Sequence, residues 1–186
     1  MYSPSLEEVK ALAGQGNLVP IYRSINADLE TPVSAYLKVA RPPYSFLLES
    51  VAGGERLGRY SFIGTEPYQV TKTGPGQPGG EVDPLTLVQA EMDRFQLIPV
   101  AGLPRFHGGA VGYLAYDAIG YFEPRVPSMP ADPQGLPESV FTYVDTLLVF
   151  DHLRHDIKVV SHLRLDGDVD RAYGEATARI DGLARR

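Results

Sequence analysis

The chain has 186 residues, of which 44% are hydrophobic and 22% are charged, and its formal net charge at neutral pH is -6. A chain of this length and composition buries a core of its own, which excludes an intrinsically disordered protein. The acidic balance argues against a nucleic-acid partner and an anionic membrane surface, and no apolar run approaches the roughly 18 residues that a membrane span needs.

Two further absences narrow the class of protein. The N-terminal sequence MYSPSLEEVK has no basic segment followed by an apolar one, so we expect no secretory signal and a cytoplasmic location. The chain contains no cysteine, which excludes disulfides, thiolate nucleophiles and cysteine-ligated zinc.

In the first half of the chain, three helix starts are marked by capping residues. Ser5 belongs to a capping box that opens a short helix, whereas Thr31 and then Asp83 each stand directly before a proline, which is favoured in the first helical turn. Alternating or continuous apolar residues predict strands between these helices. The predicted strands cover residues 19–25, 44–51, 59–65 and 68–73.

The second half is predicted to contain a glycine-rich strand with a short helix at 105–123, and then a hairpin of two strands at 139–151 and 155–165. Asp168 caps a last helix whose apolar residues repeat every three or four positions as far as Arg186. These elements predict an α+β fold, with a mostly antiparallel β-sheet and helices packed on its outer faces. We expect the apolar stripe of the last helix to pack against another part of a longer protein, so that cutting there promotes association.

Most motifs in the chain favour ordinary structural roles. Its glycine clusters match neither phosphate-binding spacing, G-x-G-x-x-G or G-x-x-x-x-G-K-[ST]. His152, His155 and His162 flank the predicted hairpin turn and are interpreted as solvated turn residues rather than metal ligands. No pair of carboxylates forms a constellation for acid–base catalysis. We therefore assign no catalytic residue and no metal ligand to this chain.

Polar residues at the end of the 44–51 strand are the exception. Glu49 and Ser50 follow an apolar run, where unpaired polar groups are costly to bury. From spacing alone, the favoured interpretation is local: Ser50 bonds a nearby amide, and Glu49 pairs with Arg56 or Arg59. Binding of a ligand by the same residues stays open as the alternative.

This strand end and three later motifs resemble one protein family. The segment LLESVAGGERLGRYSFIG resembles the signature near the N-terminus of anthranilate synthase component I, as do GNLVPIYR, FHGGAVGYLAYDAIGYFEPR and DTLLVFDH, so the similarity covers nearly the whole chain. The resemblance implies an enzyme, a lyase, that joins chorismate with ammonia and eliminates pyruvate to give anthranilate. This is the first committed step of tryptophan biosynthesis, and the ammonia comes from glutamine through a glutamine amidotransferase subunit, component II.

The resemblance also implies how the work is divided along the enzyme. Residues 1–186 would be the N-terminal regulatory domain, and the chorismate-binding catalytic part, with its Mg2+ ligands, would lie outside this chain. The fragment alone is then expected to be inactive.

A feedback site for L-tryptophan is implied at the strand end, with Ser50 the most secure match. The residues implied along this site are Leu48, Glu49, Ser50, Val51 and Arg59. Two alternatives remain: the N-terminal part of aminodeoxychorismate synthase component I, from the folate pathway, and an amino-acid-binding module without catalysis.

Overall fold

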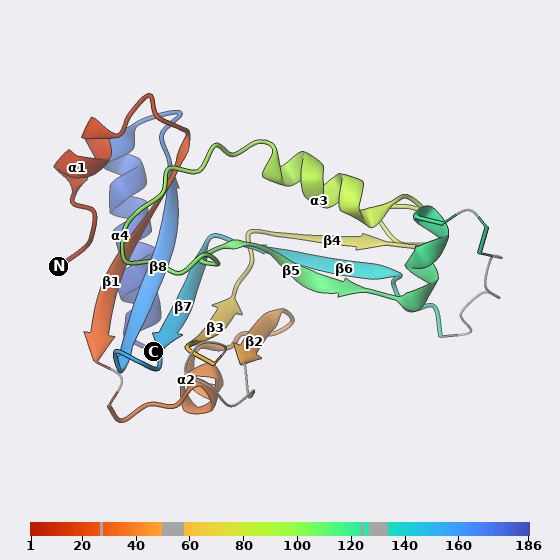
Figure 1. Ribbon diagram of the computed structural model, residues 1–186, viewed down its shortest axis with the longest axis horizontal. Coiled ribbons are helices and arrows are strands. Elements are labelled where there is room, and N and C mark those ends of the chain that lie inside the picture. Colours follow the sequence, from red (N-terminus) through yellow and green to blue (C-terminus); the bar gives the residue numbers. More distant parts are fainter. Residues whose placement is uncertain (27, 50–57, 124, 127–133) are drawn as a thin grey trace. The chain divides into compact units, whose positions relative to one another are not determined.

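The computed structural model describes residues 1–26, 28–49, 58–123, 125–126 and 134–186. They form two compact units, whose elements are labelled in Figure 1. The larger unit comprises residues 1–67, 95–108 and 144–186, and the smaller one comprises residues 68–94 and 109–143. That the whole chain acts as one regulatory domain stays a prediction.

The larger unit contains a five-stranded sheet in the order β1-β8-β7-β3-β2, and each neighbouring pair of strands is antiparallel. Its strands are β1 (Leu18–Asn26), β2 (Ser45–Glu49), β3 (Tyr60–Thr65), β7 (Thr146–Asp151) and β8 (Asp156–Arg164). The hairpin predicted near residue 155 is confirmed as the β7–β8 pair, whose register ends with Asp151 opposite Asp156.

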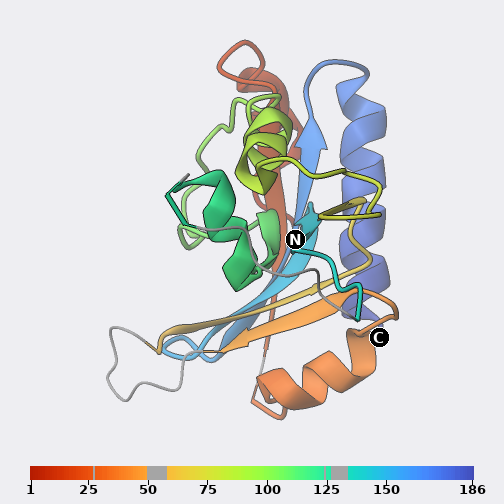
Figure 2. The ribbon, with the colours of Figure 1, turned by 90° about the vertical axis from the view of Figure 1, so that its right-hand side faces the viewer.

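The helices of the larger unit begin at the capping residues read from the sequence. They are α1 (Leu6–Ala11), α2 (Pro32–Val39) and α4 (Val169–Ala184). Ser5 and Thr31 each accept a hydrogen bond from the backbone N–H three residues later, and so does the Asp168 carboxylate. Such caps satisfy donors that have no partner inside the helix. In two perpendicular views, α4 lies along β8 (Figures 1 and 2).

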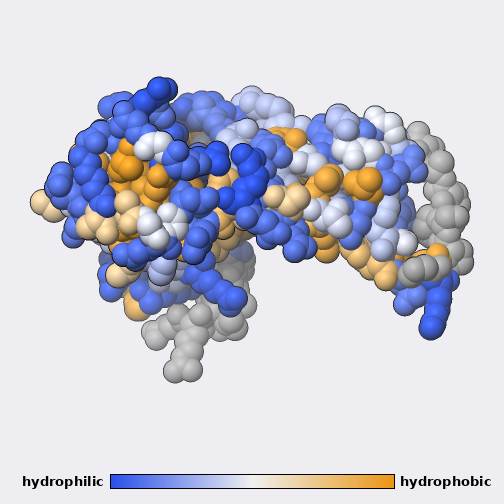
Figure 3. Space-filling view, turned by 90° about the horizontal axis from the view of Figure 1, so that it is seen from above, coloured by the Kyte–Doolittle hydropathy of each residue, from blue (hydrophilic) through white to orange (hydrophobic). Residues whose placement is uncertain are grey.

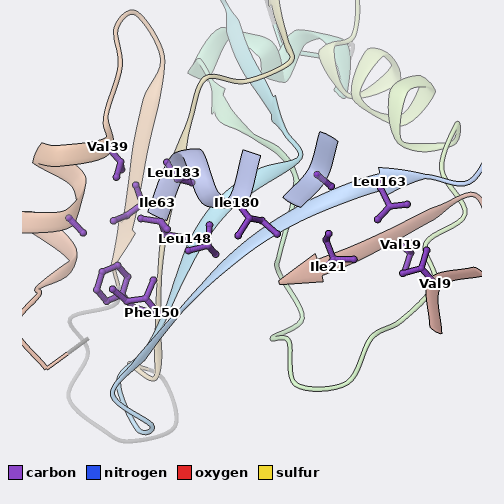
Figure 4. Close-up of a cluster of buried hydrophobic side chains, with 14 of the residues drawn as sticks. Val9, Val19, Ile21, Val39, Ile63, Leu148, Phe150, Leu163, Ile180 and Leu183 are labelled. Carbon is purple, nitrogen blue, oxygen red and sulfur yellow. The ribbon is translucent and has the colours of Figure 1, made fainter. Parts of the chain in front are cut away.

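The main core of the larger unit lies between the sheet and these helices. Buried Ile180 and Leu183 of α4 join Leu148, Val159 and Leu163 of the sheet in one cluster, part of which Figure 4 labels. Burial of each such side chain contributes about 1.5 to 3 kcal/mol to stability. The expectation that the stripe of the last helix needs another part of a longer protein is therefore wrong, because the chain's own sheet covers it.

The smaller unit contains a three-stranded sheet in the order β4-β6-β5, with helix α3 and a 3-10 helix, η1. Its elements are β4 (Gln69–Thr73), α3 (Pro84–Met92), β5 (Gly109–Leu114), η1 (Tyr116–Tyr121) and β6 (Ser139–Val144). Gly112 shows why β5 is rich in glycine, since a Cβ atom there would lie 1.9 Å from the Val140 carbonyl oxygen. Only glycine permits so close an approach of two strands.

One predicted strand is in fact two. The run 139–151 is divided at Asp145 into β6, which pairs with β4, and β7, which pairs with β3 and β8. At the break, the Asp145 carbonyl accepts the backbone N–H of His162 at 2.8 Å. A continuous apolar run predicts extended backbone but does not indicate where the chain passes from one sheet to another. Apart from this division, the predicted α+β class with mostly antiparallel strands is confirmed.

The surface is hydrophilic over most of one face (Figure 3). Hydrophilic residues predominate on the face drawn in Figure 3, and hydrophobic residues form separate patches among them. Within the described parts of the chain, no helix has both the length and the apolar character needed to cross a membrane.

Candidate functional site

The segment predicted to bind tryptophan lies at the edge of the five-stranded sheet. β2 is one of the two edge strands, and its register pairs Leu48 with Phe62 and Glu49 with Ser61. Because successive residues of a strand face opposite sides, Leu48 shares one face with Phe62, and Glu49 shares the other with Ser61. Both Leu48, at 42% exposure, and Glu49 are accessible to solvent.

The other predicted residues of the LLES motif are Ser50 and Val51, and both lie outside the described residues. The structure therefore brings Leu48 and Glu49 to one strand end but directs their side chains to opposite faces of the sheet.

The Leu48 face carries an aromatic surface. The Phe62 ring contacts Phe106 edge to face, with centroids 5.1 Å apart, and lies 6.2 Å from the Tyr60 ring. These rings pack on a small second core of Leu147, Val149 and Val160. Offset and edge-to-face geometries are those that aromatic side chains prefer. An apolar surface thus lies beside the accessible Leu48.

Arg59, the fifth predicted residue, is tied to the neighbouring strand. Its Nε and Nη2 donate to the two carboxylate oxygens of Asp151 at 3.0 and 2.7 Å, and its guanidinium lies 4.8 Å from the centre of the Tyr60 ring. The sequence suggested Glu49 as the partner of Arg59, but this bidentate partner stands 92 positions away. The other suggested arginine, Arg56, lies outside the described residues.

Asp151 is the fixed centre of this arrangement. It is 3% exposed, and its Oδ1 also accepts the backbone N–H groups of Leu153 and Arg154 in the β7–β8 turn. Burial alone would raise the pKa of Asp151, but the hydrogen bonds from Arg59 and these amides lower it below its ordinary value of 3.8. The carboxylate is therefore charged at neutral pH and joins β3 to β7.

A second polar contact lies on the Glu49 face. Buried Ser61 and exposed His152 are joined by a hydrogen bond of 2.8 Å between Oγ and Nε2, and the imidazole stacks on Phe150. His152 thus follows the sequence interpretation as a turn residue, although it has a defined partner.

His162 does not follow that interpretation, because it lies within β8 at 6% exposure. Its Nδ1 is 3.0 Å from the Asp145 carbonyl and must donate, so its Nε2 accepts from Nδ1 of the stacked His107 at 3.0 Å. Burial lowers the pKa of His162 to about 4 and also lowers that of His107. Both rings are consequently neutral at pH 7. Alternation in the 155–165 run groups His162 with Lys158 and Arg164, so the sequence gives no signal for this buried position.

The histidines do not assemble a metal centre in the described ranges. Within them, no group of three or more histidine, aspartate or glutamate side chains is arranged to hold a metal ion. The described residues therefore do not fit a Mg2+ site.

Comparisons with known proteins identify relatives along the whole chain, although no family model matches it. The chain is 38% identical over 195 residues to "Anthranilate synthase component 1" of Acetivibrio thermocellus, covering 100% of this chain and 39% of the relative. It is 42% identical over 188 residues to "Probable anthranilate synthase component 1" of Schizosaccharomyces pombe, covering 98% and 37%. The chain thus spans about two fifths of the length of these relatives.

One solved structure has a similar fold. The crystal structure of anthranilate synthase component I from Streptococcus pneumoniae TIGR4 aligns with a TM-score of 0.54 and 24% sequence identity, covering 87% of this chain and 35% of that one. At this level of identity, the likeness concerns the fold alone.

Proposed function

Because the chain belongs to the anthranilate synthase component I family, we propose that it is the N-terminal, tryptophan-sensing part of such an enzyme. The observation that carries the proposal is homology over the whole chain, at 36% to 42% identity, to proteins named for this activity. The curated and structural relatives reported above are all named as anthranilate synthase component I, which favours this enzyme over the folate-pathway alternative.

In the proposed enzyme, a catalytic part outside this chain binds chorismate and Mg2+ and releases anthranilate and pyruvate. Ammonia arrives from glutamine through component II in the cytoplasm. The present residues take no chemical step, so the 186-residue chain is inactive alone. Their proposed role is regulatory, because they contribute to the site for tryptophan, the end product of the pathway.

The geometry at the end of β2 supports a tryptophan site there. An amino-acid ligand presents an ammonium, a carboxylate and an indole ring. Leu48 and the Phe62 surface provide an apolar wall for the indole, and the outer edge of β2 provides backbone carbonyls for the ammonium. Ser50 adds a hydroxyl in this proposal, and Arg59, whose guanidinium is held by Asp151, adds a positive charge beside the ligand.

Inhibition in this scheme is allosteric. Tryptophan and chorismate bind different sites and favour different arrangements of the enzyme, so each weakens the binding of the other by the same factor. Both sites are required, and the 186-residue chain supplies only part of the tryptophan site. It is therefore expected to bind tryptophan weakly if at all.

The test uses the full enzyme with chorismate, ammonia and Mg2+, and follows the fluorescence of released anthranilate. Ser50→Ala is expected to raise the tryptophan concentration for half inhibition by roughly 5- to 150-fold, because one hydrogen bond worth about 1 to 3 kcal/mol is lost. Activity without tryptophan should be nearly unchanged. Ser24→Ala is the matched control, because Ser24 is an exposed serine on β1, at the opposite edge of the same sheet.

Two outcomes contradict the proposal. Accumulation of aminodeoxychorismate in place of anthranilate would assign the chain to the other enzyme. Unchanged inhibition in Ser50→Ala would reject the site. The chain itself contains no tryptophan residue, so the emission of added tryptophan reports its binding directly.

A further inference from the structure

A recess lies in the larger unit at the other end of β3, away from Leu48. Its volume is about 320 Å³, which is within the range of small-molecule sites. It is enclosed by the residues after β3, the start of β7 and the last two turns of α4. The lining residues that matter here are Glu66, Asp145, Arg179, Gly182, Leu183 and Arg186.

The guanidinium of Arg179 is fixed by hydrogen bonds to β8. Its Nε donates to the Ser161 hydroxyl at 3.0 Å, and its Nη2 donates to the His162 carbonyl at 2.7 Å. Ser161 is fully buried and shares a further hydrogen bond of 2.9 Å with Thr146. A guanidinium fixed in this way has lost its rotamer freedom before any ligand arrives, which favours binding.

Asp145 lies opposite Arg179 but is too far from it for a hydrogen bond between their side chains. Its carboxylate accepts the Thr146 hydroxyl at 2.9 Å, but Oδ2 is 4.0 Å from Arg179 Nη2, and both side chains are more than a third exposed. In the Arg23–Asp181 ion pair, which has a similar exposure, Nη1 and Oδ1 are only 2.8 Å apart. The charges of Asp145 and Arg179 are thus fixed near each other while each keeps capacity for another partner.

Glu66 and Arg186 form an ion pair at the rim of the recess. The hydrogen bond from Arg186 lowers the pKa of Glu66, which is therefore ionised at neutral pH. Glu66 has a φ of +49°, a left-handed conformation that is unfavourable for a residue with a side chain. Backbone strain of this kind is concentrated at functional sites.

The recess therefore presents two carboxylates and two guanidinium groups around a mostly apolar wall at Gly182 and the edge of Leu183. A multiply charged anion would meet two carboxylates, and a simple cation would meet two arginines. A ligand carrying one charge of each sign at adjacent positions complements the whole set. We propose that this recess binds a free α-amino acid, with its carboxylate toward the arginines, its ammonium toward Asp145 and Glu66, and its side chain along the wall at Gly182.

Two glycines of α4 allow a controlled test in the 186-residue chain. A Cβ atom at either Gly182 or Gly174 would meet no atom within 4 Å, so both positions accept a larger side chain. Gly182 lines the recess, whereas Gly174 is exposed on the same helix outside it. Gly182→Leu should fill the recess, and Gly174→Leu is the matched control for helix stability.

The experiment titrates each of the standard L-amino acids into the chain and measures heat of binding. At least one is expected to bind with a Kd in the millimolar range or below, with Gly182→Leu weakening it by about tenfold or more and Gly174→Leu by less than about twofold. The proposal fails if none of them binds, or if both variants lose binding equally.

Analogues of the best binder test the charge argument. Its α-carboxamide lacks the carboxylate and its deaminated acid lacks the ammonium, so each should bind about tenfold more weakly or worse. A deaminated acid that binds as well as the amino acid would show a simple anion site and overturn the proposal. Loss of binding in Ser50→Ala would place the ligand at the β2 end instead, with the same consequence, whereas the Ser50 prediction does not depend on the recess.

Discussion

The two ends of β7 each place an aspartate opposite an arginine, yet the two pairs differ in burial and in the distance between the charged groups. Asp151, the last residue of the strand, is buried and binds Arg59 through two short hydrogen bonds. Asp145, directly before the strand, is partly exposed and stands 4.0 Å from Arg179. The first pair uses its hydrogen-bonding capacity inside the fold, and the second retains part of it.

This difference separates a structural ion pair from a candidate binding group. A buried charge is tolerated only when its partners are complete, so the Asp151 end cannot rearrange without loss of stability. Partly exposed groups have lower desolvation costs and can exchange water for a ligand. The residue types are the same, and the surrounding contacts decide the role.

Asp151→Ala gives the largest expected effect, because it removes the partner of Arg59 and the acceptor of the β7–β8 turn together. We expect the free energy of unfolding, measured in urea, to fall by about 3 to 5 kcal/mol. Asp156, opposite Asp151 in the register, cannot replace it because Lys158 already binds its carboxylate. Asp166→Ala, which breaks an exposed pair with Arg164, should cost less than about 1 kcal/mol, and equal losses would contradict the distinction.

Lowering the pH should first remove the stability contribution of neutral His162, which lies beside Asp145, and then that of Asp151 at the other end of β7. His162 is neutral in the fold, with its pKa lowered from 6.5 to about 4, so the unfolded chain takes up the proton first. Stability is complete above pH 6.5 and is expected to fall by about 3 kcal/mol as the pH decreases to 4. Neutral His107, the Asp145 carbonyl and carboxylate, and the Arg179 guanidinium face this ring.

The contribution of charged Asp151 to stability is lost only at lower pH. Because the pKa of Asp151 is lowered from 3.8, its contribution is present above that value and disappears as the pH falls further below it. Urea unfolding at a series of pH values measures both phases. His162→Asn should abolish most of the dependence between pH 6.5 and 4 while leaving the lower phase, and an unchanged upper phase would show that His162 is not its source.

The sequence predicted what local rules determine. The caps at Ser5 and Thr31 and the extended run of β8 depend on residues within a few positions of one another, so the sequence predicts them correctly. The Arg59–Asp151 pair and the division of the 139–151 run depend on which strands become neighbours, which no local pattern records. The burial of His162 has no such local signal, because alternation groups it with Lys158 and Arg164, and its position beside a predicted turn favoured the wrong interpretation.

The candidate site was predictable only through resemblance. Spacing alone favoured a local partner for Glu49, and the LLES motif supplied the tryptophan prediction, which still awaits its test. The recess at Asp145 has no linear signature, because its groups come from three segments that only folding brings together.

The smallest expected effects concern strained backbone at the two ends of β7. The β7–β8 turn contains His155, with a φ of +54°, and the recess contains Glu66, with a φ of +49°. Replacing His155 with glycine relieves about 1 to 2 kcal/mol of left-handed strain but increases the entropy of the unfolded chain by about 0.4 to 1 kcal/mol. We therefore expect His155→Gly to stabilise the protein by about 0.5 to 1 kcal/mol in urea unfolding.

Glu66→Gly relieves similar strain but also removes the half-exposed pair with Arg186, worth about 0 to 1 kcal/mol, so its net effect should be near zero. A stabilisation equal to that of His155→Gly would mean that the Arg186 pair contributes nothing to the fold. The strained backbone at Glu66 would then not stabilise the free protein through any contact. This is expected of a residue whose conformation is required for binding a ligand. A large destabilisation would instead make the Glu66–Arg186 pair structural, like that of Arg59 and Asp151, and would remove the distinction between the two ends.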